Sequence, residues 1–351
     1  MRIMALDLGG YQATVCEYDT NSGAQQFSKS RSTPQELHDL LAEHRPARLV
    51  FEIGPQAGWV HDLATELGIE VQVANPNHEG WRWRRVKRKT DRGDALKLAQ
   101  LSAMNQLPLA YLPARPVRQW RSLIRHRHKL MNRRIAVKNL IRSILLREAV
   151  AWPEGKRGWT QESVAALKEL ARPIDTVEVD ELWRAQLWLA LEELAGVEQL
   201  ISAADRRLDA IGNLDQRVKR LQTIPGVGPR LAEVVVAIID KPERFRRANQ
   251  VAAYAGLTPK QLESGTVQIS GRITKQGDPL LRTLLVEVSW LGLLHNPWAR
   301  NIYHRTRKGS VARNKLAIIA VARRLLIRCW AMLRDRSDWR SPEPVAVAPG
   351  S

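Results

Sequence analysis

The chain is short of cysteine, of long apolar runs and of acidic residues. Its 351 residues include only two cysteines, Cys16 and Cys329, which lie far apart and form no C-x-x-C pair. This spacing excludes a disulfide scaffold and a zinc site built on cysteines. The most apolar stretch, around residues 280–294, is interrupted by Glu287 and is too short to span a membrane. The sequence therefore predicts a soluble protein of a reducing compartment.

Acidic residues are too few to balance the basic ones. Against 36 acidic residues the chain has 55 lysines and arginines, which gives a formal net charge of +19. Hydrophobic residues still make up 44% of the chain, so it can bury a core. A folded protein of this charge is expected to bind a polyanion, with nucleic acid ahead of an anionic membrane surface.

The surplus charge is concentrated in three blocks. Residues 81–92 hold seven basic residues and one acid, residues 115–150 hold eleven and one, and residues 300–328 hold nine and none. Residues 161–215 carry twelve acids and five bases, and they are expected to serve helix pairing. Such blocks favour separate nucleic-acid-binding faces over an evenly solvated surface. In the first block the expected contacts are Arg84, Arg85, Lys87, Arg88 and Lys89, with Trp81 and Trp83 as weaker candidates for base stacking.

The first hundred residues show the alternation of an α/β domain. Short apolar runs alternate with helical patterns, and Thr33 with Glu36 three residues later has the spacing of a capping box. The order of elements indicates a mixed sheet covered by helices. The predicted strands are Arg2–Asp7, Thr14–Asp19, Arg48–Ile53 and Glu70–Ala74, and the predicted helices start at Thr33 and span about 57–67.

The middle of the chain has the periodicity of two long helices. Apolar residues recur at helical spacing from residue 116 to about 150, and again from about 177 to 211. The first helix would be about 50 Å long, which is too long for a compact single core. The pair is expected to form a coiled-coil hairpin that reaches outward or pairs subunits.

The last part begins with the sequence TIPGVGP, a glycine-rich turn between two helices. It matches a helix-hairpin-helix pattern, in which the backbone at Gly226 and Gly228 would bind a phosphate, although any Gly/Pro turn between helices would look the same. A polar loop over 258–279 and basic helices over about 280–292 and 312–334 are expected to follow. The chain is therefore divided into residues 1–108, 109–215 and 216–335, with a disordered tail at 336–351.

Four carboxylates lie where strands end or a helix begins. Asp7 and Glu52 end predicted strands, and Asp91 and Asp94 are placed on one face of a helix start by their spacing of three. Such a cluster repels itself unless cations neutralise it, so it predicts a two-metal Mg²⁺ site, with Mn²⁺ as a substitute. Taken singly, each acid is more often a turn residue, a surface acid or a helix cap. The combination favours the metal site.

A loop serine surrounded by cations is the second candidate site. Ser264 would be a nucleophile for a phosphodiester, because neighbouring cations would stabilise the developing charge. The pattern alone favours an ordinary turn serine, and Ser270 in the next Ser-Gly pair is an equal competitor. The expected phosphate-binding residues around it are Lys260, Arg272, Lys275 and Arg282.

Together these motifs resemble the DEDD-type insertion-sequence transposases, whose characterised members are recombinases guided by a bridge RNA. The resemblance covers nearly the whole chain and is carried by ALDLGG, FEIG, RKTDRGDALKLA, TIPGVGP, FRRANQVAAYAGLTPKQLESG and GRITKQGDPLLRTLL. It implies a RuvC-like first domain with an RNase-H-type sheet, whose acidic quartet maps onto Asp7, Glu52, Asp91 and Asp94. It also maps the catalytic serine onto Ser264 and not onto Ser270. Glu263 departs from the small or polar residue that is usual before that Ser-Gly pair.

The resemblance further implies a reaction and its partners. Ser264 would attack a DNA phosphate to give a phosphoserine intermediate, while the metal-binding acids activate the scissile phosphate or the departing oxygen. The partners would be donor and target DNA, a structured bridge RNA and further copies of the chain, as a dimer or a pair of dimers in a prokaryotic cytoplasm. Two other interpretations stay open. One is a metal-dependent junction nuclease in which Ser264 is structural, and the other is an architectural binder without enzymatic activity.

Overall fold

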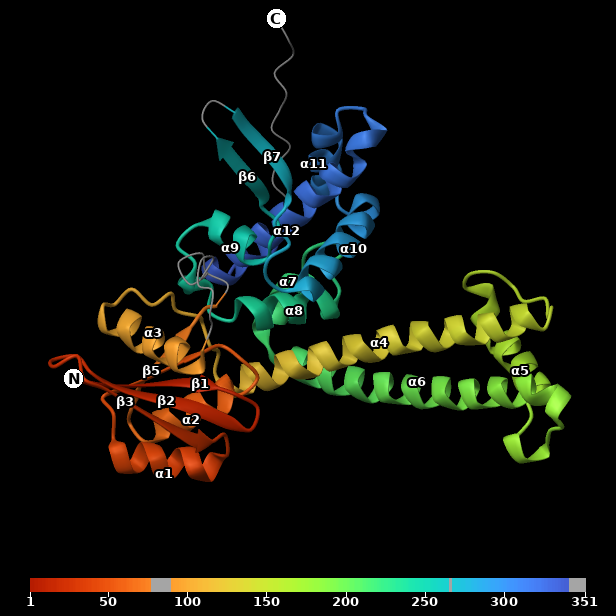
Figure 1. Cartoon of the computed structure of the whole chain (residues 1–351). Coiled ribbons are helices and arrows are strands. Elements are labelled where there is room, and N and C mark those ends of the chain that lie inside the picture. Colours follow the sequence, from red (N-terminus) through yellow and green to blue (C-terminus); the bar gives the residue numbers. More distant parts are fainter. Residues whose placement is uncertain (77–89, 265–266, 341–351) are drawn as a thin grey trace, which may run out of the picture. The chain divides into compact units, whose positions relative to one another are not determined.

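The computed structural model describes residues 1–76, 90–264 and 267–340, and for 261–264 and 267–270 it describes the backbone only (Figure 1). The contacts between residues separate two compact units, with unit 1 comprising Met1–Arg118 and unit 2 starting at Gln119. Among the described residues, no helix is long and apolar enough to cross a membrane.

Unit 1 is built on a five-stranded mixed sheet with the strand order β3-β2-β1-β4-β5. Strands β1, β2 and β3 are antiparallel neighbours, whereas β4 is parallel to both β1 and β5. The sequence-based prediction of a mixed sheet is confirmed, and each of the four predicted strands is placed within two residues. The elements are β1 Arg2–Leu8, β2 Gln12–Asp19, β3 Gln25–Arg31, α1 Pro34–His44, β4 Arg48–Glu52, α2 Ala57–Glu66, β5 Glu70–Ala74 and α3 Asp91–Ala103.

Helices cover both faces of this sheet because successive side chains of a strand point to opposite faces. Met4 and Leu6 of β1 pack in one core with α1 and α2, whereas Ile3 and Ala5 pack in a second core with α3. Figure 1 shows α1 and α3 on opposite sides of the strands. The predicted cap of α1 is confirmed, since the Thr33 hydroxyl accepts a hydrogen bond from the backbone N–H of Glu36.

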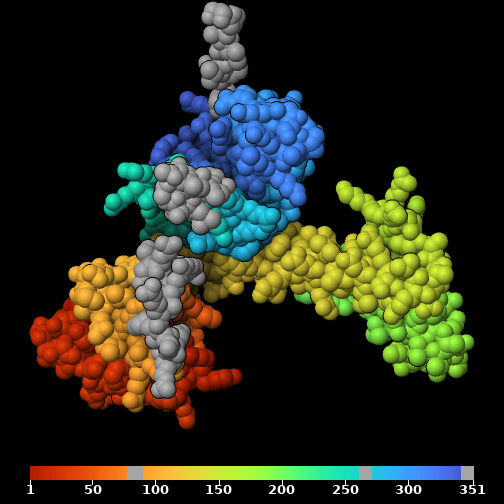
Figure 2. Space-filling view, turned by 45° about the horizontal axis from the view of Figure 1, so that its top comes forward, coloured from red at the N-terminus to blue at the C-terminus, as the bar shows by residue number. Residues whose placement is uncertain are grey.

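Unit 2 consists of a long helical arm, a helical bundle and a two-stranded hairpin. The arm is formed by α4 and α6 with α5 between them, and in Figure 2 its α4 surface is yellow. Short 3₁₀ turns lie at 157–159, 174–176, 179–181, 242–244 and 311–313. The longer elements are α4 Arg115–Arg147, α5 Gln161–Leu170, α6 Leu182–Leu214, α7 Gln216–Gln222, α8 Pro229–Ile239, α9 Ala248–Tyr254, β6 Pro259–Ser264, β7 Val267–Ile273, α10 Pro279–His295, α11 Pro297–Arg307 and α12 Asn314–Asp335.

The two helices of the arm are joined by apolar packing and by ion pairs. Val137 and Ile141 of α4 share a buried core with Leu194 of α6. Ion pairs cross between the helices from Arg127 to Asp205, from Arg133 to Glu193 and from Lys138 to Glu198, with N–O distances of 3.0 Å for the first and 3.6 Å for the last. The predicted helical hairpin is thereby confirmed. The acidic stretch of the sequence serves to pair α6 with the basic α4.

The bundle of unit 2 is organised around α8. All side chains of α8 from Leu231 to Ile239 are buried, and α7, α10 and α12 pack against it. The predicted glycine-rich turn between two helices is confirmed as the connection of α7 to α8. The predicted helices at 280–292 and 312–334 correspond to α10 and α12. The prediction did not include α11.

Two sequence-based predictions in unit 2 were wrong. Residues 258–279 do not form a loop, because β6 and β7 pair there as an antiparallel hairpin. Charged and polar residues concealed the strands, although Val267, Ile269 and Ile273 lie at even spacings, as alternating strand residues do. The tail does not start at 336, because Trp339 packs edge-on against Trp298 at a ring distance of 5.4 Å. Residues 341–351 lie outside the described residues.

A buried carboxylate lies between α8 and the arm. Glu233 is 1% exposed and forms an ion pair with Arg230 at 3.1 Å, and Arg230 also pairs with Asp205 and Asp209 of α6. The Glu233 side chain packs closely against α6, since a Cβ atom at Gly212 would lie 2.9 Å from the Glu233 Oε1 atom. Burial raises the pKa of Glu233 to about 7, against the opposing effect of Arg230.

We expect the free energy of unfolding to fall as the pH rises from about 4.5 to about 7. In this window the folded state keeps on Glu233 a proton that the unfolded chain releases, so each rise in pH favours unfolding. The loss should not exceed about 3 kcal/mol. Urea unfolding of Glu233→Gln at pH 5 and pH 8 should show a smaller difference than wild type does. The exposed Glu192→Gln serves as control, and an identical pH dependence of Glu233→Gln and wild type would contradict the assignment.

Candidate active site

Asp7 and Glu52 lie at the ends of two adjacent parallel strands. Leu6 of β1 pairs with Phe51 of β4, so Asp7 and Glu52 follow side by side. Because side chains alternate along a strand, Asp7 shares the sheet face of Ala5, which is the face covered by α3. Both acids line one cavity of about 220 Å³, whose remaining wall is formed by Leu8, Gly10 and residues 53–57. The two strand-end acids predicted from the sequence are therefore brought together.

Asp91 and Asp94 occupy the first turn of α3, as predicted. The Thr90 hydroxyl caps this helix by accepting a hydrogen bond from the backbone N–H of Gly93 at 3.2 Å. Asp94 is buried, whereas Asp91 is exposed. Since Leu98 of the same helix packs in the core beneath that face of the sheet, Asp94 lies on the same side of the sheet as Asp7 and Glu52.

Lys97 connects the helix start to the strand end, and the sequence-based prediction did not include it. Desolvation lowers the pKa of Lys97, while the charges of Asp94 and Glu52 act to raise it. Both carboxylates therefore lie within electrostatic reach of its ammonium group. The available signal in the sequence was the spacing of three between Asp94 and Lys97, which places them on one helix face.

The four acids suit a hard divalent cation by their chemistry. Carboxylate oxygens are the ligands that Mg²⁺ prefers, and the cavity at Asp7 and Glu52 offers two of them. Among the described residues, however, no three Asp, Glu, His or Cys side chains are placed so as to hold one metal ion. The structure thus pairs two acids at a cavity and brings Asp94 to the same face. The complete four-carboxylate metal site stays a prediction.

The serine candidates are separated by the hairpin. Ser264 is the last residue of β6 and pairs with Val267, so its backbone lies at the tip of the hairpin. Ser270 lies within β7, opposite Gln261. Their side chains lie outside the described part of the structure.

The cations that were predicted to surround the serine differ in their positions. Lys260, Arg272 and Lys275 are exposed or partly exposed. Arg282 is partly buried, and its Nη1 atom donates to the carbonyl oxygens of Ala255 at 3.1 Å and Gln276 at 2.9 Å. Burial also lowers the pKa of Arg282. The predicted contacts Arg84, Arg85, Lys87, Arg88 and Lys89, with Trp81 and Trp83, fall in residues 77–89, outside the described residues.

The turn between α7 and α8 has the backbone that its glycines allow. Gly226 adopts a φ of +90°, which favours glycine, and a Cβ atom there would lie 3.6 Å from Gly292 of α10. Gly228 is the N-cap of α8 and has no side chain to accept a hydrogen bond from the first backbone N–H groups of the helix. The positive end of the helix dipole faces this turn. Phosphate binding at Gly226 and Gly228 stays a prediction.

The C-terminal end of the described chain rests on this same turn. The backbone N–H of Trp339 donates to the Thr223 hydroxyl at 2.9 Å, and Asp338 pairs with Arg220 at 3.5 Å. Arg328 lies over the Trp339 ring, 5.4 Å from its centre. The four residues 337–340, which we call the C-terminal strap, therefore hold the residues that lead into the turn.

Two family models match the chain. One lies within unit 2, and the other covers nearly all of unit 1 and the start of unit 2. The model described as "Transposase IS116/IS110/IS902 family" matches residues 218–304, and a model described as "Transposase", of the IS110 DEDD type, matches residues 4–149. The first contains the α7–α8 turn and the hairpin with Ser264. The second contains all four candidate acids.

Curated relatives match over most of the chain. The chain is 29% identical to y4rJ of Sinorhizobium fredii, whose name describes a transposase, over 88% of this chain and 86% of that protein. It is 26% identical to the transposase for insertion sequence element IS1111A of Coxiella burnetii, over 78% of this chain and 74% of that protein. Among solved structures, the Thermus thermophilus RuvC structure matches 31% of this chain and 100% of its own, at 16% identity and a TM-score of 0.23.

Proposed function

We propose that the chain is a transposase of the IS116/IS110 insertion-sequence family and that it cuts and rejoins DNA through a covalent intermediate on Ser264. A bridge RNA would pair with donor and target DNA and so select both. The metal-binding residues in this proposal are Asp7, Glu52, Asp91 and Asp94.

The observation that carries the proposal is the arrangement of acids at the end of the sheet. Asp7 and Glu52 meet at one cavity because β1 and β4 are parallel and adjacent, and Asp94 approaches the same face from α3. The strand order β3-β2-β1-β4-β5, with three antiparallel strands followed by two parallel ones, supports an RNase-H-type sheet. A divalent cation bound there would neutralise charge on the oxygens of the scissile phosphate. Lys97 would offset part of the repulsion between Glu52 and Asp94.

The proposed role of Ser264 rests on the family resemblance, and its backbone position at the hairpin tip is compatible with that role. Its hydroxyl oxygen would form a bond to a DNA phosphorus atom, and the bond from that phosphorus to a deoxyribose oxygen would break. The hydroxyl proton is released in this step, and the departing oxygen is protonated. Lys260 and Arg272 are exposed on the two strands of the hairpin, where their charges would hold phosphate oxygens. The reverse attack by a new DNA end would complete strand transfer.

The partners are assigned by the distribution of free charge. Three cations of α4 are already engaged by acids of α6 within the arm, which makes them weaker candidates for binding nucleic acid. The proposed role of the arm in a dimer or a pair of dimers rests on the family resemblance. The block at 300–328 holds no acid. It is the stronger candidate for binding RNA or DNA backbones. Its cations at or near the surface include Arg305, Lys308, Arg313, Lys315 and Arg324.

A second candidate function is a metal-dependent junction nuclease in which Ser264 has no chemical role. The pairing of Asp7 with Glu52 at one cavity favours it, because that pairing does not depend on the serine. The two functions differ in whether a covalent protein–DNA adduct forms.

We expect Ser264→Ala to abolish the covalent adduct and strand transfer while DNA affinity changes less than about twofold, since one hydroxyl is removed from a charged surface. The measurement is an incubation with end-labelled DNA, resolved on a denaturing gel. Ser270→Ala is the matched control and should keep full activity. Undiminished cleavage by Ser264→Ala would instead establish the nuclease function.

We expect Mg²⁺ to raise the melting temperature of the protein, and Asp7→Asn or Glu52→Gln to remove most of that rise. Binding to the folded state alone stabilises by about 2.7 kcal/mol at 100 times the dissociation constant. Thermal melts with Mg²⁺ and with EDTA measure it, and Glu43→Gln, on α1, is the control. An unchanged Mg²⁺ effect in both site variants would rule out these acids as ligands.

We expect a structured non-coding RNA to co-purify with the protein and to be identified by sequencing. Replacing Arg305, Lys308 and Arg313 together by alanine should weaken its binding, and the slope of log K against log salt should fall by about one for each phosphate that is no longer neutralised. Arg133→Ala, in the arm, serves as control because Glu193 already engages that arginine. Recovery of random RNA fragments alone would argue against guidance by RNA.

A further inference from the structure

The hairpin of β6 and β7 leaves the bundle through a crossing of two backbone segments. Gly256 has a φ of +68°, and a Cβ atom there would lie 2.0 Å from the carbonyl oxygen of Gln276. Gly277 has a φ of +85°, and its Cβ atom would lie 1.9 Å from the carbonyl oxygen of Tyr254. Only glycine permits both the conformation and the contact at these positions. The segment entering the hairpin and the segment leaving it therefore touch through their backbones.

One arginine joins the two segments at this crossing. The Nη1 atom of Arg282 donates to Ala255 on the entering side and to Gln276 on the leaving side. The backbone N–H of Lys275 also donates to the carbonyl of Gly256 at 3.2 Å. The carbonyls of Ala255 and Gln276 thus receive charge-assisted hydrogen bonds from a single guanidinium group, which fixes their separation.

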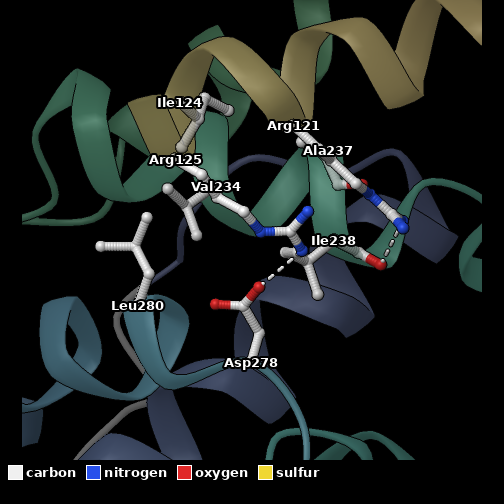
Figure 3. Close-up of a pocket in the computed structure, with 8 residues that line it drawn as sticks. All are labelled: Arg121, Ile124, Arg125, Val234, Ala237, Ile238, Asp278 and Leu280. Carbon is white, nitrogen blue, oxygen red and sulfur yellow. Dashed lines mark hydrogen bonds and ion pairs between the residues drawn. The ribbon is translucent and has the colours of Figure 1, made fainter. Parts of the chain in front are cut away.

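The leaving segment is also attached to the arm. Asp278 caps α10 by accepting from the Leu281 N–H at 3.0 Å, and its other carboxylate oxygen pairs with Arg125 of α4 at 2.8 Å. Figure 3 shows this pair beside Arg121, which donates to the carbonyls of Ala237 and Ile238 at the end of α8. The Asp278 side chain of this pair is largely buried, whereas about half of the Arg125 side chain is exposed.

The hairpin itself has little other support. Among the described elements, β6 and β7 make extensive contacts only with each other, and Figure 1 shows them projecting from the bundle. The strand from Pro259 to the tip at Ser264 has six residues, which make a lever of about 20 Å at ~3.3 Å per residue. A rotation of about 3° at the crossing would therefore move Ser264 by about 1 Å, which is enough to cost on the order of a hundredfold in rate.

We propose that Arg282 is a positioning residue for Ser264, acting through the crossing at the base of the hairpin. The proposal rests on the proposed function, because it concerns the same serine. Arg282 fixes the direction in which the hairpin leaves the bundle. The Arg125–Asp278 ion pair holds the leaving segment against α4 of the arm. This role differs from the phosphate contact expected for Arg282 from the sequence.

The test compares Arg282→Gln with Arg172→Gln. Arg172 also donates from its Nη1 atom to two carbonyls, those of Glu169 at 2.6 Å and Ala171 at 2.9 Å, but both belong to its own segment at the end of α5, so it joins no two segments. Three quantities are measured for each variant: amide hydrogen exchange in residues 259–273, DNA affinity, and the rate of covalent adduct formation at saturating DNA. We expect Arg282→Gln to speed exchange in the hairpin and to slow adduct formation by on the order of tenfold or more, with DNA affinity within about twofold of wild type. Arg172→Gln should alter none of the three.

Two results would overturn the proposal. One is unchanged exchange in the hairpin of Arg282→Gln. The other is weakened DNA binding with an unchanged rate at saturation, which is the result that a phosphate contact predicts. If Ser264→Ala keeps full cleavage, the proposed function fails, and hydrogen exchange alone then decides whether Arg282 anchors the hairpin. If Arg282→Gln does not fold, Arg282→Lys takes its place under the same criteria, because it keeps the charge and removes the fork of the guanidinium group.

Discussion

Arginine side chains that donate to backbone carbonyls allow the buried central helix of unit 2 to end inside the protein. The carbonyl oxygens at the end of α8, from Ala237 to Asp240, accept hydrogen bonds from the guanidinium groups of Arg121, Arg244 and Arg217. These donors come from three separate segments, and each supplies positive charge where the helix dipole is negative. The buried α8 can therefore end inside the protein with its last carbonyls satisfied.

This use of arginine changes the meaning of the net charge. Part of the surplus lies within the fold, at helix ends and across the arm, where it meets carbonyl oxygens and the acids of α6. The positive charge that remains for binding nucleic acid is smaller than the net charge of +19 suggests, and it is confined to fewer segments. The block at 300–328 holds no acid, so its exposed cations form the clearest free surface among the described residues. The net charge thus indicated nucleic acid as the class of partner, and the structure narrows the candidate binding surface to the block at 300–328.

Short-range patterns in the sequence predicted what depends on neighbours along the chain. Apolar runs located four of the five strands of unit 1 and missed the polar β3. The strand-end position of Asp7 and Glu52 predicted their meeting, since parallel neighbours end together. The place of Lys97 between Asp94 and Glu52, the exposure of Asp91 and the fold of residues 258–279 were not predicted. Each depends on packing between distant segments, or on strands whose polar side chains hide their period. The bridge made by Arg282 belongs to this second class, because its two carbonyl partners lie 27 and 6 residues away.

The C-terminal strap has a consequence for the synthesis of the protein. Thr223 and Trp339 are 116 residues apart, yet they share a hydrogen bond at the turn that opens the bundle. A ribosome adds about 5–20 residues per second, so this turn waits roughly 6 to 23 seconds for its last partner. Until then α7 and α8 lack both the Trp339 ring and the Asp338 carboxylate. Completion of the bundle is thus tied to synthesis of the strap, and a product cut short before the strap would lack the finished turn.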